Sequence, residues 1–188
     1  MYNFEDTDSQ LQTIPFDLKA GQAYLFLASR STLHKLFNPI IANLALAGHL
    51  QVIDAGNQFD FYAIARMIRK STPHFEETLA QIHIARAFTC YQVVTMLVQM
   101  HSVGFPLLIT NMLTTFYDES VHLSERQMLL RQCLNELNRF KAQVPVVISA
   151  SPHKDDPNDK FITLLENACD QITRFETLPP QSCQLSLF

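Results

Sequence analysis

Residues 105–112 read FPLLITNM, an apolar run that follows a glycine and gives way to an asparagine. A strand with apolar side chains on both faces is typical of the middle of a parallel sheet, where helices cover both faces. Four other runs have a similar character, and they are QAYLFLAS at 22–29, LQVID at 50–54, IHIARAF at 82–88 and VPVVISA at 144–150. The sequence therefore predicts several parallel strands, most of them buried.

Segments with helical periodicity separate these runs. Phe61, Ile64 and Ile68 fall on one face of a helix that Asp60 can cap. The other helical segments are residues 74–81, 91–104 and 124–142, the last opened by Ser-Glu-Arg-Gln as a capping box. Strands that alternate with helices predict an α/β fold with a mostly parallel β-sheet, helices on both faces, and ligands at the carboxyl ends of the strands.

Two segments are harder to interpret. Helical spacing runs through residues 31–46, but Pro39 lies in the middle of them and Asn38 before it is a good cap. Since proline is best tolerated at the first helical position, we expect the well-formed helix to begin at Pro39. Residues 161–176 are expected to mix strand and helix.

The composition indicates one cytoplasmic domain. The chain has 188 residues, 47% of them hydrophobic, and a formal charge of -4, which argues against a broad nucleic-acid footprint. The N-terminus resembles no signal peptide, and no run reaches the roughly 18 apolar residues that cross a bilayer. We expect an acidic N-terminal segment at 1–14, a core at 15–177 and a tail at 178–188.

Neither a metal nor a cofactor is expected. The four cysteines, which are Cys90, Cys133, Cys169 and Cys183, lie far apart without a Cys-x-x-Cys spacing. Buried thiols in a reducing cytosol are therefore the favoured interpretation. The acidic pair Asp155 and Asp156 is interpreted as a solvated turn.

Three segments taken in order resemble the core of the RecA/RadA recombinases. They are IARAFTCYQVVTMLV, FPLLITNMLTTFY and LSERQMLLRQCLNELNRFKAQVPVVISA, preceded by VIDAGNQFDFYAIAR. The resemblance covers residues 15 to 176, and its most specific parts are the ARAF and SERQ segments. It implies a RecA-like three-layer fold with a nucleotide site at the strand ends.

The residues at that implied site depart from the pattern of the family. A phosphate loop needs Gly-x-x-x-x-Gly-Lys-Ser/Thr, but residues 28–35 read ASRSTLHK. Asn111 stands at the place of the Walker B aspartate, and Ala55-Gly56 replace the pair with the catalytic glutamate. The altered nucleotide site comprises Ala28, Arg30, Leu33, His34, Lys35, Asp54 and Asn111. With three parts of the phosphoryl-transfer machinery replaced, we expect no ATP hydrolysis and no catalytic residue.

The last five residues, QLSLF, resemble the pentapeptide by which bacterial proteins bind the sliding clamp of DNA polymerase. The resemblance implies that the Gln184 carboxamide is the polar anchor and Ser186 the small spacer. Leu185, Leu187 and Phe188 would be the apolar contacts, held off the core by Pro179-Pro180. The alternative for this segment is a last strand or plug that packs on the core.

These features predict a non-catalytic RecA-fold accessory of bacterial DNA repair, recombination or translesion replication, with a RecA-like recombinase or a translesion polymerase as further partners. The short acidic or neutral loops YDESVH and PHKDDPND argue against direct DNA binding. Two alternatives remain open. One is a switch that binds ATP through Arg30, Lys35 and His34, and the other is a structural subunit that assembles with itself or with an active RecA-like paralogue.

Overall fold

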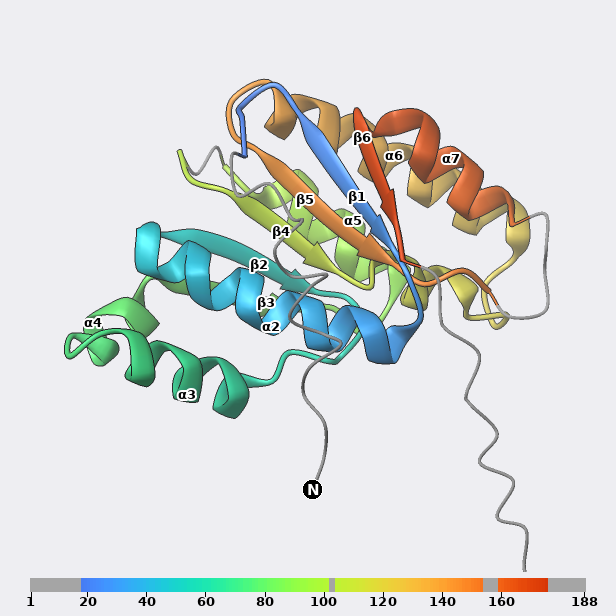
Figure 1. The fold of residues 1–188 in the computed structure, drawn as a ribbon. Helices are drawn as coiled ribbons and strands as arrows, with labels where there is room; N and C mark the ends of the chain where they lie inside the picture. The colour runs from blue at the N-terminus through green and yellow to red at the C-terminus, as the bar shows by residue number, and fades with distance from the viewer. Residues whose placement is uncertain (1–17, 102–103, 154–158, 176–188) are drawn as a thin grey trace, which may run out of the picture.

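A six-stranded, all-parallel sheet forms the centre of the chain (Figure 1). The computed structural model describes residues 18–101, 104–153 and 159–175. The spatial order of the strands is β3-β2-β4-β5-β1-β6. Their bounds are β1 Ala23–Leu27, β2 Leu50–Asp54, β3 Ile82–Arg86, β4 Leu107–Thr110, β5 Val146–Ala150 and β6 Gln171–Arg174.

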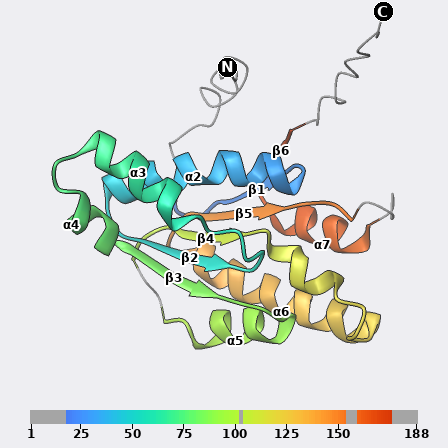
Figure 2. The same cartoon turned by 90° about the horizontal axis from the view of Figure 1, so that it is seen from below.

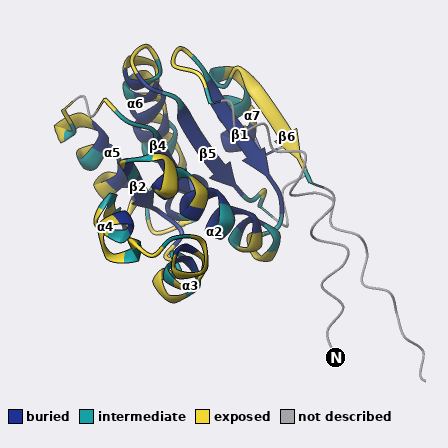
Figure 3. Cartoon of the chain, turned by 60° about the vertical axis from the view of Figure 1, so that its left-hand side comes forward, coloured by how far each residue is buried: buried dark blue, intermediate teal, exposed yellow. Residues whose placement is uncertain are grey.

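The central strands are buried because their runs are apolar on both faces. Every residue of β1, β4 and β5 is buried, whereas all four residues of the edge strand β6 are exposed (Figure 3). β4, the strand of the FPLLITNM segment, pairs with β2 on one side and β5 on the other. It therefore lies where the sequence predicts a central parallel strand.

Helices cover both faces of the sheet (Figure 2). One layer consists of α2 Arg30–Ala47, α3 Phe61–Ser71 and α4 Phe75–Ala80. The other consists of α5 Cys90–Gln99, the 3-10 helix η1 Met112–Tyr117, α6 Leu123–Lys141 and α7 Lys160–Ala168. The predicted α/β class, with a parallel sheet between two helical layers, is confirmed, and the arrangement is consistent with a RecA-like three-layer fold.

The predicted start of α2 is wrong. The helix begins at Arg30, where the side chain of Ser29 caps it by accepting a hydrogen bond from the backbone N–H of Thr32 at 3.2 Å. Pro39 therefore lies inside the helix and deprives the Lys35 carbonyl of its usual donor. Lys35 is exposed, so water can satisfy that carbonyl.

Two other helix ends also differ from the prediction. α6 begins at Leu123, and its N-cap His122 makes no side-chain capping bond, so the expected capping box at Ser124 is wrong. α5 ends at Gln99, five residues before Gly104. The mixture expected at residues 161–176 is confirmed as a helix, α7, followed by a strand, β6.

In the part of the chain that the structure describes, no helix is both long and apolar enough to span a bilayer.

Candidate functional site

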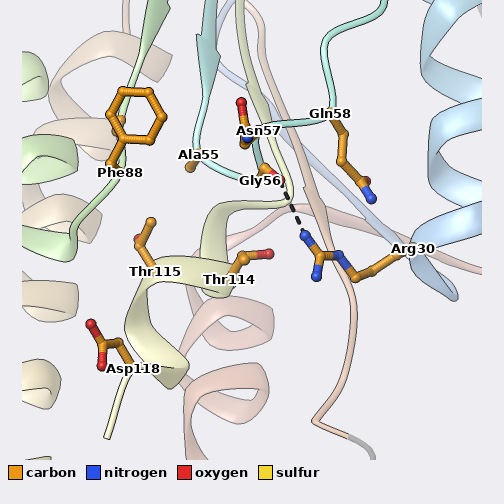
Figure 4. Close-up of a pocket in the computed structure, with 10 residues that line it drawn as sticks. Arg30, Ala55, Gly56, Asn57, Gln58, Phe88, Thr114, Thr115 and Asp118 are labelled. Carbon is orange, nitrogen blue, oxygen red and sulfur yellow. Dashed lines mark hydrogen bonds between the residues drawn. The ribbon is translucent and has the colours of Figure 1, made fainter. Parts of the chain in front are cut away.

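At the carboxyl ends of the neighbouring strands β2 and β4, the chain turns away in opposite directions, which makes this place a switch point of the sheet. The chain leaves β2 toward β3 on one side and leaves β4 toward β5 on the other. Crevices form at such points in parallel sheets because neighbouring connections turn away from each other. An open pocket of about 540 Å³ lies here, lined by the loops that follow β2, β3 and β4 and by Arg30 of α2 (Figure 4).

Asp54, the last residue of β2, is fully buried. One carboxylate oxygen accepts hydrogen bonds from the N–H of Gln58 at 3.0 Å and the hydroxyl of Thr110 at 3.1 Å. The other accepts from the N–H of Phe59 at 3.1 Å and from Nε of Arg86 at 3.0 Å. A carboxylate offers about four lone-pair sites, so these four donors occupy it. Asp54 thus joins β2, β3, β4 and the following loop.

Asn111 occupies the end of β4 in the left-handed region, with φ 49° and ψ 47°. Its backbone N–H donates to the hydroxyl of Ser149 at 2.8 Å, and its Nδ2 donates to Oε1 of Gln58 at 2.6 Å. Its Oδ1 accepts from the hydroxyl of Ser151 at 3.3 Å. The amide that stands at the Walker B position therefore links the loop after β2 to the end of β5.

Arg30 reaches from the first turn of α2 across the mouth of the pocket. Its Nη2 donates to the carbonyl of Gly56 at 3.1 Å (Figure 4). Two backbone N–H groups at the start of α2 already have acceptors within the chain. The N–H of Thr32 donates to the side chain of Ser29, and the N–H of Leu33 donates to the Ser29 carbonyl at 2.9 Å. An incoming phosphate would have to displace these bonds to use the start of this helix.

The other residues predicted for the nucleotide site do not line the pocket with Arg30. Ala28 and Leu33 are buried in the core between the sheet and α2. Lys35 is exposed, and Nε2 of His34 lies 3.9 Å from a carboxylate oxygen of Asp60. Of the residues assigned to the altered nucleotide site, only Arg30 lines this pocket.

Several pocket residues were not identified from the sequence, and they are Asn57, Gln58, Phe88, Thr114, Thr115 and Asp118. Each follows a strand end, which is the only signal that could have pointed to them. Thr115 is buried, and its hydroxyl has no hydrogen-bond partner among the described residues. Asp118 accepts from the N–H of Ser120 at 3.0 Å, and this bond lowers the pKa of its carboxyl.

Of the described cysteines, Cys90 and Cys133 are buried and Cys169 is partly buried. Burial raises the pKa of Cys133 to about 12, and burial likewise raises the pKa of Cys169 to about 12. Thiols of this kind are poor nucleophiles and poor metal ligands at neutral pH. Among the residues that the structure describes, no group of three or more His, Cys, Asp and Glu side chains is placed to hold a metal ion.

The predicted clamp-binding residues, Gln184 to Phe188, lie outside the described residues, as do the acidic N-terminal segment and most of the loop at 152–159. No protein-family model matches the chain, and no curated protein matches it either.

Proposed function

We propose that this chain is a non-catalytic accessory protein of bacterial DNA repair, recombination or translesion replication that QLSLF recruits to the sliding clamp. The observation that carries the non-catalytic part is the fourfold hydrogen bonding of the Asp54 carboxylate. A carboxylate that serves a magnesium ion or a nucleophilic water must turn an oxygen toward it. Both oxygens of Asp54 are instead used to hold three strands and a loop together.

The pocket supports the same proposal. A nucleotide would need amides for its phosphates and an acidic residue for its metal ion. At this place the side chain of Ser29 caps the start of α2, and Arg30 donates a hydrogen bond to the carbonyl of Gly56. The nitrogen and the oxygen of the Asn111 side-chain amide are both hydrogen-bonded within the chain. The fold is therefore better suited to act as a scaffold than to perform phosphoryl transfer.

In this proposal the pentapeptide QLSLF binds the sliding clamp in the cytoplasm and so recruits the chain to it. Burial of one leucine or phenylalanine side chain contributes about 1.5–3 kcal/mol, and ordering of a peptide offsets part of this gain. Two or three such anchors give an affinity on the order of micromolar, which suits a reversible tether.

A pull-down against a purified bacterial sliding clamp tests this proposal. The full chain should bind, and Leu187→Ala/Phe188→Ala should bind at least about tenfold more weakly because two anchors are lost. Leu178→Ala lies in the same tail but outside the pentapeptide, so it is the matched control and should bind like the wild type. Equal binding of all three proteins, or no binding of the wild type, would refute recruitment by QLSLF.

One observation favours a second candidate, a nucleotide-responsive switch without hydrolysis. The pocket of about 540 Å³ is large enough for a small ligand, and Arg30 places a cation at its mouth. Differential scanning fluorimetry with ATP and magnesium separates this candidate from the scaffold, because only a nucleotide that binds the folded chain raises its melting temperature.

A further inference from the structure

We propose that His49 and His83 form a binding site for one divalent transition-metal ion of the zinc, nickel and copper group. The two histidines lie near the amino-terminal ends of β2 and β3, at the edge of the sheet opposite to the pocket. His49 immediately precedes β2, and His83 is the second residue of β3, where it pairs with Gln51. Both side chains are exposed, so an ion in solution can reach them.

The separation of the two ring nitrogens fits a shared ion. Nδ1 of His49 and Nε2 of His83 are 3.2 Å apart. Imidazole nitrogens bind zinc at about 2.0–2.1 Å, which places two of them about 2.9 Å apart at a right angle and about 3.3 Å apart in a tetrahedron. The observed separation lies between these values. An ion bound by both nitrogens lies beside the line that joins them, so each ring must turn until its lone pair points roughly 35–45° away from that line.

The orientation of the rings places the two nitrogens opposite each other. Their planes differ by 15°, and their centroids are 5.4 Å apart, much farther than the two nitrogens. The nitrogens are therefore the parts of the rings that face each other, and their in-plane lone pairs point into the space between them. A nitrogen donates a metal bond along this in-plane direction, just as it accepts a hydrogen bond.

The protein holds this pair in place from three sides. The start of β2 is bonded to the residue before β3 (Leu50 N–H to the Gln81 carbonyl, 3.1 Å), and Gln51 N–H donates to the Pro106 carbonyl at 2.9 Å. Beside that carbonyl, the ring of Phe105 lies 5.4 Å from the ring of His83 and 5.8 Å from that of His49. Because the two backbones are already fixed side by side, metal binding requires the rings to rotate but does not require the strands to move.

The chemistry requires no other reactant. Without metal, one proton lies between the two nitrogens in an N–H···N hydrogen bond. When the ion binds, that proton moves to the other nitrogen of the same ring, and each facing nitrogen donates its lone pair to the ion. Imidazole is a good ligand for zinc, copper and nickel, and water completes the coordination shell. An ion so held joins the edge strand β3 to β2.

Thermal unfolding of the full-length chain with ZnCl2 or NiCl2 tests the site. The melting temperature should rise with metal concentration, because an ion that binds only the folded state stabilises it. His49→Ala and His83→Ala should each weaken the metal response at least about tenfold, since the chelate is lost. His122→Ala removes another exposed histidine and should respond like the wild type.

Electron paramagnetic resonance of the chain with one equivalent of Cu²⁺ provides a second measurement that does not depend on stability. Coupling to two imidazole nitrogens is expected in the wild type and in His122→Ala, and to one in each single variant of the pair. The site is refuted if the metal response survives in both His49→Ala and His83→Ala, or if the wild type shows one nitrogen.

Discussion

Gly56 lies directly against Asn111: a Cβ atom built at position 56 would be 2.4 Å from the Cβ of Asn111 and 3.1 Å from its Cγ. Cβ atoms do not approach other non-bonded carbon atoms this closely, so a side chain at position 56 would displace the neighbouring chain. The contact joins the loop after β2 to the end of β4, at the site where the amide of Asn111 makes its two side-chain hydrogen bonds. Glycine is therefore needed here for space, and its conformation is not the reason, because its φ is not positive.

Gly56→Ala should destabilise the fold by about 1–3 kcal/mol, because the added methyl group overpacks a closed contact. Urea unfolding followed by circular dichroism measures this loss. Asn111→Gly removes the opposing Cβ and suits the left-handed backbone, so the double variant should lose less stability than the sum of the two single variants. Strictly additive losses would show that the two positions do not clash.

Asp54→Ala should cost about 2–5 kcal/mol, because the change leaves two loop amides and the Thr110 hydroxyl without their acceptor. The same unfolding measurement applies, with Asp118→Asn as an exposed carboxylate from the pocket for comparison. That control is expected within about 0.5 kcal/mol of the wild type. A normal stability for Asp54→Ala would show that the four hydrogen bonds of this carboxylate do not hold the fold together.

The strands could be predicted from the sequence because continuous apolar runs such as residues 105–112 are informative without any tertiary context. The start of α2 could not be predicted, since the prediction gave Pro39 more weight than Ser29. Burial of Leu33, Leu36 and Phe37 against the sheet offsets the hydrogen bond that proline removes.

The candidate site was predicted only in part for a different reason. The sequence indicates which strand ends approach each other, but not which polar atoms meet there. Asp54 accepts hydrogen bonds from Arg86 and Thr110, which follow it by 32 and 56 positions in the chain. Asn111 donates to Gln58, which precedes it by 53 positions. Only the folded chain reveals that these side chains are already paired, and this pairing is what distinguishes a structural network from a metal site.

Addition of ATP with magnesium should leave the melting temperature of the wild type unchanged at millimolar concentration, because a ligand that does not bind the folded state cannot stabilise it. Differential scanning fluorimetry measures the shift, and Arg30→Ala provides the comparison. A rise in the wild type that Arg30→Ala abolishes would favour the nucleotide-responsive switch over the scaffold.

Asp170 should contribute stability that depends on pH. Its carboxylate accepts a hydrogen bond from the N–H of Ala23 at 2.7 Å and lies 3.1 Å from Nζ of Lys141. The bond from Ala23 and then the lysine lower the pKa of this carboxyl below its value in the unfolded chain. A lowered pKa in the folded state means that the contribution is complete above the unfolded pKa of about 3.9 and is lost as the pH falls through the folded pKa.

Asp170→Asn keeps an oxygen that can accept from Ala23 but removes the charge, so it isolates this contribution. The wild type should melt at a higher temperature than the variant at pH 6 to 7, and the two melting temperatures should converge as the pH falls from about 3.9 through the lowered pKa of the folded state. Glu76→Gln, which neutralises an exposed carboxylate on α4, is the matched control. A difference between Asp170→Asn and the wild type that stays constant from pH 7 to pH 2 would show that the charge of Asp170 does not stabilise the junction of β1 with α6.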